Sequence, residues 1–165
     1  WGMHLAHIGL AVFVVGVALS KGYESEKDVR MAPGDVLTLG DYQFRLLGLR
    51  AAPGPNYSAV VAEIELSRDG RVLELLRPEK RKYFSSEMPM TEAAIDPGLT
   101  RDVYGAIGEP LGEGAWSVRA HVKPFVGWIW AGALLMALGG LLAAADRRYR
   151  ARAPVAAAGF AGAKA

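Results

Sequence analysis

The 165-residue chain contains no cysteine and only three histidines. The missing cysteine excludes disulfide bonds, thiolate metal sites and Cys-x-x-Cys redox chemistry. A large charge of either sign is also missing, because 19 Lys and Arg face 17 Asp and Glu, and this balance gives no indication of a nucleic-acid partner. Charged residues are absent altogether from residues 1–20 and 125–145, and these two stretches organise the chain.

Both uncharged stretches are long enough to cross a membrane. About 20 apolar residues in a helix, rising about 1.5 Å each, span the roughly 30 Å hydrocarbon core of a bilayer. We therefore predict transmembrane helices at 1–20 and 125–145. A signal peptide is the alternative for the first stretch, because Ala18-Leu19-Ser20 resembles a cleavage site, but the basic residues that begin signal peptides are missing.

The residues after the second stretch predict the orientation of the chain. Four arginines follow within seven residues, namely Arg147, Arg148, Arg150 and Arg152. Arginines beside a helix end stay on the cytoplasmic side, so the basic, alanine-rich tail 146–165 is expected in the cytoplasm. Two spans then place residues 21–124 in the periplasm or its equivalent and the whole chain in the inner membrane.

Between the spans, apolar and polar residues alternate in short runs, as is typical of half-buried strands. The strands expected from this pattern are 36–39, 42–49, 57–67, 71–77 and 116–123. Asp69-Gly70 joins two of them, since this dipeptide supplies the positive φ angles of a tight hairpin. Residues 90–95 are expected to form a helical turn. The predicted fold class is membrane α-helical, with two helices flanking an inserted small antiparallel β domain.

Two histidines, His4 and His7, lie inside the first predicted span, where an imidazole without a partner is costly. At about 100° per residue they share one helix face with Ala11, Val14 and Ala18. The opposite face carries Gly2, Gly9 and Gly16, and glycines let a neighbouring helix approach closely. We therefore expect protein on both sides of this helix, within a larger bundle. The histidine face then holds either a haem-iron ligand or a histidine hydrogen-bonded to another helix.

Other polar candidates are weaker. His121 shares a strand face with Arg119 and is expected to be a solvated strand residue. Lys80-Arg81-Lys82 before Tyr83-Phe84 is interpreted as a solvated strand end, with an acidic partner or haem propionates as the alternative. Trp128 and Trp130 at the start of the second span are interpreted as anchors in the lipid headgroup region. Close helix packing is also predicted at Gly132, Gly139 and Gly140.

Several motifs occur in an order that resembles one family. They are WGMHLAHIGLAV at 1–12, EKDVRM at 26–31, GPNY at 54–57, MTEAAI at 90–95, TRDVYGAIG at 100–108, GAW at 114–116 and KPFVGWIWAGALLMALGG at 123–140. Together they resemble the C-terminal part of the CcmF family, the haem-lyase membrane subunit of the cytochrome c maturation system. The resemblance covers residues 1–150.

The resemblance implies a polytopic inner-membrane protein that takes haem from a haem chaperone. It attaches the haem to the Cys-x-x-Cys-His motif of apocytochrome c, together with a maturation subunit that presents the apocytochrome. The family also holds a permanent haem b in its membrane bundle. His7 matches the histidine of the family's GHxGLA-like segment, with Ala6 in place of a glycine, so His7 is the expected axial ligand of haem iron. His4 has no counterpart, and no catalytic residue is assigned.

Several family features have no match in this sequence, including the tryptophan-rich WWD segment, the two periplasmic histidines and the histidine opposite His7. We therefore expect the chain to be one part of a haem lyase, working with the remaining transmembrane segments and not catalytically competent by itself. Two other functions stay open. One is a membrane-anchored periplasmic docking or scaffold module, and the other is the related subunit that assembles nitrite-reductase haems.

Overall fold

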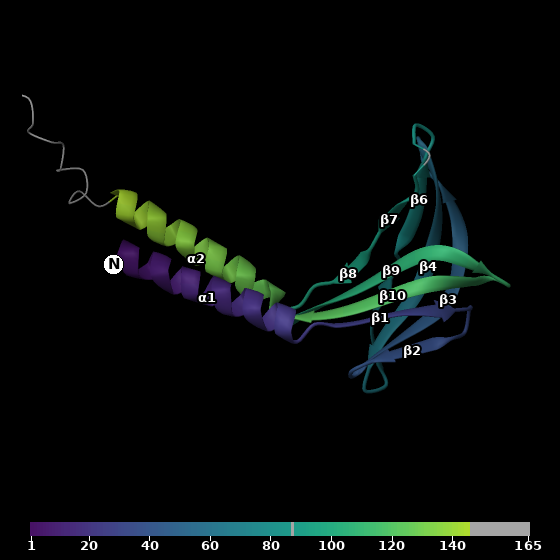
Figure 1. Ribbon diagram of the computed structural model, residues 1–165, viewed down its shortest axis with the longest axis horizontal. Coiled ribbons are helices and arrows are strands. Elements are labelled where there is room, and N and C mark those ends of the chain that lie inside the picture. Colours follow the sequence, from purple (N-terminus) through teal and green to yellow (C-terminus); the bar gives the residue numbers. More distant parts are fainter. Residues whose placement is uncertain (87, 146–165) are drawn as a thin grey trace, which may run out of the picture. The chain divides into compact units, whose positions relative to one another are not determined.

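The computed structural model describes residues 1–86 and 88–145 (Figure 1). The chain divides into two compact units. One contains residues 16–128, and the other contains residues 1–15 together with the chain from residue 129 onward. The tail 146–165 and its arginine cluster lie outside the described residues.

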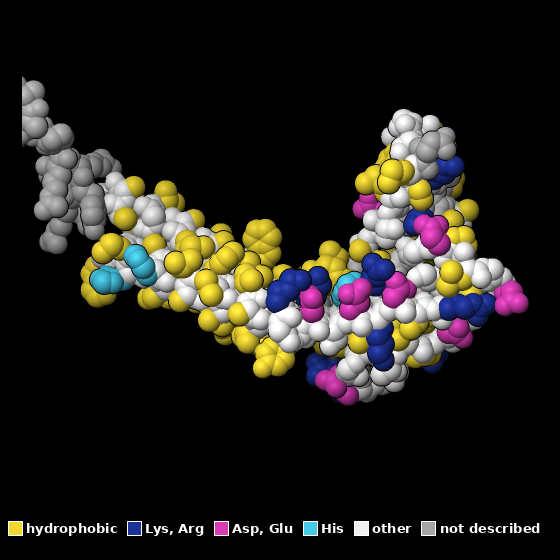
Figure 2. Space-filling view, in the orientation of Figure 1, with side chains coloured by type: hydrophobic (Ala, Val, Ile, Leu, Met, Phe, Trp, Pro, Cys, Tyr) yellow, Lys and Arg dark blue, Asp and Glu magenta, His cyan; other side chains and the backbone are white. Residues whose placement is uncertain are grey.

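Two long helices begin and end the described chain, α1 at Gly2–Gly22 and α2 at Val126–Ala145. Both are long and apolar enough to cross a membrane, and only 11% of each candidate span is buried within the chain. Figure 2 shows that hydrophobic side chains cover the helices, whereas acidic and basic side chains gather over the β domain. Exposed apolar surface of this extent is typical of helices that contact lipid or other apolar partners.

Ten strands in the described residues form two antiparallel sheets. The first sheet has the order β1-β10-β9-β8, and the second has the order β2-β3-β4-β6-β7, with β5 also paired to β4. The strand bounds are β1 Ser25–Met31, β2 Val36–Leu39, β3 Tyr42–Pro53, β4 Tyr57–Arg68, β5 Arg71–Leu76, β6 Glu79–Tyr83, β7 Met90–Glu92, β8 Ala94–Asp96, β9 Arg101–Gly112 and β10 Ala115–Pro124.

The hydrophobic core of the β domain lies between the two sheets. Alternate residues of the second sheet, such as Phe44 and Ile64, are fully buried, as are Ile107 and Val118 of the first sheet. Because successive strand residues point to opposite faces, this alternation leaves the charged residues outside. The predicted fold class, two apolar helices flanking an antiparallel β domain, is confirmed.

The five strands expected from alternation are present as β2, β3, β4, β5 and β10. The hairpin between β4 and β5 is also confirmed, since Asp69 and Gly70 have φ angles of 51° and 73°. The helical turn expected at 90–95 is wrong. Met90 pairs with Arg81 of β6, and Ala94 pairs with Gly105 of β9, so strand pairing supplies the backbone hydrogen bonds that a local turn would otherwise make.

Candidate functional site

His7 lies on the second turn of α1, and its imidazole is oriented by the helix backbone. Its Nδ1 is 2.7 Å from the carbonyl oxygen of Met3, one turn earlier. A carbonyl only accepts hydrogen bonds, so Nδ1 carries a proton and donates it, and in the neutral imidazole the lone pair lies on Nε2. The side chain is exposed within this chain. His7 therefore presents an accessible nitrogen with its tautomer already set.

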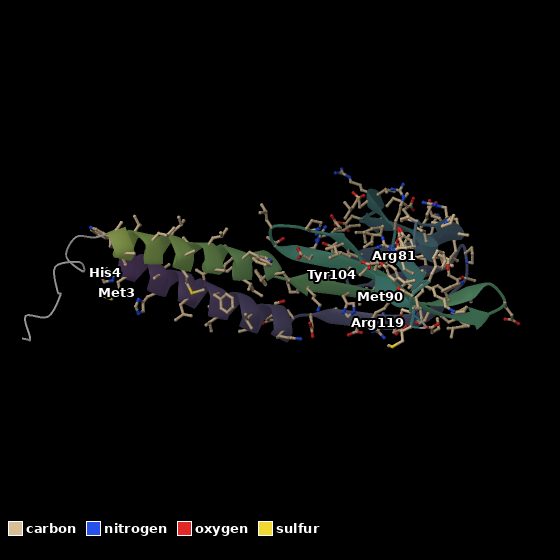
Figure 3. The ribbon with its side chains drawn as sticks, turned by 90° about the horizontal axis from the view of Figure 1, so that it is seen from above. Met3, His4, Arg81, Met90, Tyr104 and Arg119 are labelled. Atoms are coloured by element: carbon tan, nitrogen blue, oxygen red, sulfur yellow. The ribbon has the colours of Figure 1, made fainter. Side chains whose placement is uncertain are left out.

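His4 shares this helix face but has a different environment. Figure 3 places Met3 and His4 near the beginning of α1. The His4 side chain is exposed, and it makes no hydrogen bond to any residue that the structure describes. Ala11, Val14 and Ala18, which were predicted to share the histidine face, are exposed as well. Within the described chain, this face is left uncovered.

The opposite face of α1 packs directly on α2, as its glycines predicted. A Cβ atom added to Gly9 would lie 2.6 Å from the backbone nitrogen of Met136, and one added to Gly2 would lie 2.8 Å from the carbonyl oxygen of Gly139. The two helices run antiparallel, because the beginning of α1 meets the end of α2. Gly132 and Gly139 make the matching contacts from α2, whereas a Cβ at Gly140 would meet nothing within 4 Å. The prediction is thus confirmed at Gly132 and Gly139 only.

The donor set at His7 fits one axial position of a haem iron. A neutral imidazole whose Nδ1–H bonds a backbone carbonyl is a typical iron ligand, because that bond fixes the ring and raises the basicity of the other nitrogen. No group of three or more His, Asp or Glu side chains in the described part of the chain is arranged to hold a metal ion. A metal at His7 therefore requires further ligands from outside these residues.

His121 belongs to a charged network on the sheet surface. It lies on β10 with its Nε2 3.6 Å from Glu26 of β1, and its side chain is 22% exposed. Arg119, also on β10, contacts both Glu26 and Asp28, at 3.4 and 2.7 Å. The expectation that His121 shares a face with Arg119 is correct, but its imidazole is more enclosed than that of a fully solvated residue.

Asp28 is the most strongly held acid of this network. The Ser117 hydroxyl and the Arg119 guanidinium both donate hydrogen bonds to its carboxylate. These two hydrogen bonds hold the pKa of Asp28 below its usual range, and the bond from Ser117 has the larger effect. The network therefore stabilises the sheet with Asp28 ionised and offers no unpaired nucleophile or base.

The basic run on β6 is largely neutralised. Arg81 donates from Nε to Glu79 at 2.8 Å, lies 3.7 Å from Glu92, and has its guanidinium 4.8 Å from the ring centroid of Tyr57. The hydrogen bond to Glu79 is the main reason that the pKa of Arg81 is raised. Lys80 bonds Glu109 at 2.6 Å. Lys80 and Arg81 are therefore engaged by acidic partners, whereas Lys82 is exposed near the end of β6.

Sequence reasoning did not find two other contacts. One is the hydrogen bond from His7 Nδ1 to the carbonyl oxygen of Met3, four residues earlier, for which the sequence holds no distinguishing signal. The other is the Tyr42 hydroxyl, which accepts a 2.6 Å hydrogen bond from Arg101 Nε. The second pair is 59 residues apart in the chain, so no local pattern predicts it.

Comparison with known proteins places this fold in a family. Residues 22–124 match the family model described as the CcmF C-terminal beta-sandwich. A solved structure of Cytochrome c Heme Lyase CcmF superimposes with a TM-score of 0.74 at 25% identity, covering 85% of this chain and 23% of that chain.

Curated relatives agree with the family match. "Cytochrome c-type biogenesis protein CcmF" of Pseudomonas aeruginosa is 56% identical over 150 residues, and that of Escherichia coli is 53% identical over 152 residues. "Cytochrome c-type biogenesis protein NrfE" of Haemophilus influenzae is 39% identical over 141 residues. These alignments cover 86–92% of this chain but only 22–24% of the relatives, so the chain spans about a quarter of their length. The chain belongs to the CcmF family, and it corresponds to the family's C-terminal β-sandwich with a long apolar helix on each side.

Proposed function

We propose that this chain forms the C-terminal part of a cytochrome c haem lyase and acts in cytochrome c maturation. The observation that carries the proposal is the match of residues 22–124 to the CcmF C-terminal beta-sandwich. Since the chain covers 23% of its P. aeruginosa relative, the lyase activity is assigned to the complete assembly and not to this part alone.

His7 is proposed as one axial ligand of a membrane haem b. When bound, that haem would supply an iron centre that exchanges single electrons. The Met3 carbonyl, 2.7 Å from Nδ1, would keep the His7 ring oriented with a proton on Nδ1, so that Nε2 is the nitrogen of the neutral imidazole that faces the iron. His4, without a bond that sets its tautomer, is given no ligand role.

The β domain, residues 21–124, is proposed to lie in the periplasm with the tail 146–165 in the cytoplasm. The antiparallel contact of α1 and α2 puts both outer ends of the helices on one side of the membrane, and the arginines that begin at Arg147 favour the cytoplasm for that side. The proposed partners are the remaining transmembrane segments of the lyase, a haem chaperone, apocytochrome c and the maturation subunit that presents it.

Maturation of cytochrome c is favoured over assembly of nitrite-reductase haems. Relatives named CcmF are 51–56% identical to this chain, compared with 39% for the relative named NrfE. A scaffold module without a haem ligand is the other alternative. That function would leave the oriented imidazole of His7 in the span without a use, and an imidazole facing lipid is costly.

A chimaera tests the proposal. Residues 1–150 of this chain would replace the matching segment of the P. aeruginosa relative, and covalently attached haem in c-type cytochromes would be measured in cells lacking their own CcmF. We expect near-normal cytochrome levels. A stable, membrane-inserted chimaera that matures no cytochrome c would contradict the proposed function, and normal maturation by its His7→Ala form would favour the scaffold alternative.

A further inference from the structure

Leu99 is the most exposed large hydrophobic side chain of the described β domain, at 91%. It lies in the short loop between β8 and β9. A single exposed leucine needs no explanation by itself, since apolar atoms make up much of any protein surface. Leu99 is notable because hydrogen bonds fix the loop that carries it and because the loop lies beside the first turn of α2.

The loop is built to hold a fixed shape. Asp96, where the loop begins, and Arg101, where it ends, form an ion pair with Nη1 and Oδ2 2.8 Å apart. The same guanidinium donates from Nε to the Tyr42 hydroxyl at 2.6 Å, and the backbone N–H of Gly98 donates to Asp102 at 3.1 Å. These bonds close the loop at its base. Leu99 is therefore held outward by the surrounding structure.

The loop also lies against the first turn of α2. The N–H of Phe125 donates to the carbonyl of Thr100 at 2.8 Å, and a Cβ at Gly127 would lie 3.2 Å from the carbonyl oxygen of Leu99. Phe125 adopts a left-handed φ of 60°, which is unusual for an aromatic residue, and its ring meets that of Trp128 edge to face at 5.4 Å. Leu99 is thus beside the point where an apolar, membrane-length helix begins.

Side chains typical of a membrane interface surround the same junction. Glu24 bridges Lys21 at the end of α1 and Lys123 at the end of β10, at 3.4 and 3.7 Å. Tyr23 is 69% exposed and Trp128 is 41% exposed. Lysines extend their charge to lipid phosphates while their stems stay in apolar surroundings, and amphipathic aromatic rings favour the headgroup region. Apolar, aromatic and basic groups are therefore combined at one place.

We propose that the β8–β9 loop is a membrane anchor of the β domain, with Leu99 inserted at the boundary between lipid headgroups and acyl chains beside the start of α2. The partner is the bilayer itself. Burial of the leucine there recovers the hydrophobic free energy that is lost by its exposure to water. The anchor fixes the base of β9 against the membrane surface. The inference rests on α2 spanning the membrane, as in the proposed function.

Fluorescence quenching tests the anchor in the complete 165-residue chain, reconstituted in lipid nanodiscs. Because the chain has no cysteine, a single one is introduced as Leu99→Cys and labelled with an environment-sensitive fluorophore. Lipids brominated near the top of the acyl chains serve as quenchers. Leu111→Cys is the matched control, since Leu111 is 49% exposed at the other end of β9, roughly 33 Å along the strand from Arg101 at about 3.3 Å per residue. Trp130→Cys, on α2, reports insertion of the helix.

We expect quenching at residue 99 to match that at residue 130 and to exceed that at residue 111 several-fold. Quenching at 130 with no more quenching at 99 than at 111 would overturn the anchor while leaving the proposed function intact. Absence of quenching at 130 would overturn the spanning role of α2 and the anchor with it. Quenching at 99 that disappears in the complete lyase would assign Leu99 to a neighbouring helix and overturn the lipid partner.

Discussion

Gly9 of α1 and Gly132 of α2 approach so closely that neither position has room for a side chain. A Cβ on Gly9 would lie 2.8 Å from the carbonyl oxygen of Gly132, and a Cβ on Gly132 would lie 2.7 Å from that of Gly9. Gly2 and Gly139 repeat the contact seven residues away along each helix. In a membrane, where no hydrophobic force joins helices, this close backbone packing is what holds them together.

Replacement of Gly132 by leucine should separate the two helices. The leucine side chain would meet the α1 backbone, so the axes should move towards the spacing of about 8–10 Å found with larger side chains. Pulsed electron paramagnetic resonance between spin labels at Met3 and Leu142, both more than half exposed, measures the change. Gly140→Leu is the control, because a Cβ there meets nothing within 4 Å. Equal distances in the two variants would refute the packing role of Gly132.

The Tyr42 hydroxyl should contribute measurably to the stability of the β domain. It accepts hydrogen bonds from Arg101 at 2.6 Å and from Arg68 at 3.3 Å. Tyr42→Phe keeps the buried ring but removes the acceptor, so we expect a loss of about 1–2 kcal/mol in the free energy of unfolding. Thermal unfolding followed by circular dichroism measures it. Tyr57→Phe, which keeps the ring beside Arg81, should change little, and a similar effect of both substitutions would contradict this account.

Asp28 should make stability depend on pH in the acid range. The Ser117 hydrogen bond, and after it the Arg119 hydrogen bond, lower the pKa of Asp28 in the folded chain. The contribution of Asp28 to folding stability is therefore complete above the unfolded pKa of about 3.9. It is lost as the pH falls through the lower folded pKa. Asp28→Asn should therefore cost about 1 kcal/mol or less at neutral pH and nothing in strong acid. Melting curves of both proteins across this range measure the effect. A difference in stability that stays the same as the pH falls would contradict this role of Asp28.

The sequence predicted those helices, strands and turns that depend only on residues adjacent in the chain. The uncharged helices, the alternating strand Val36–Leu39 and the Asp69-Gly70 turn each follow from adjacent residues. The glycine face of α1 also followed, because helical periodicity alone places Gly2 and Gly9 together. The contacts on α2 then confirmed it.

Other strands depended on partners distant in the chain. The β1 strand, Ser25–Met31, has a mostly charged sequence, and its structure comes from pairing with β10. An example is Asp28 with Arg119, which lies 91 residues later in the chain. The short strands at 90–96 have no alternation long enough to detect. For the candidate site, the sequence provided His7, but its tautomer depends on a backbone carbonyl that only the folded helix brings within 2.7 Å.

Cysteine labelling should separate the two sides of the membrane. Cysteines placed singly at Ser67 and Ala156 would be treated with a membrane-impermeant thiol reagent added to intact spheroplasts. We expect labelling at residue 67, on strand β4, and none at residue 156 until the membrane is opened. The opposite result would reverse the proposed orientation, in which residues 21–124 are periplasmic.

The ligand role of His7 is tested most directly by the optical spectrum of the complete haem lyase carrying His7→Ala, with His4→Ala as the matched control on the same helix face. Because His7 Nε2 has its lone pair set by the bond to Met3, we expect the first variant to lose haem b or to become five-coordinate and high-spin. Added imidazole should partly restore the low-spin spectrum. The His4→Ala protein should keep a six-coordinate, low-spin haem. A His7→Ala protein with a full complement of low-spin haem would contradict the account and leave His7 a packing residue.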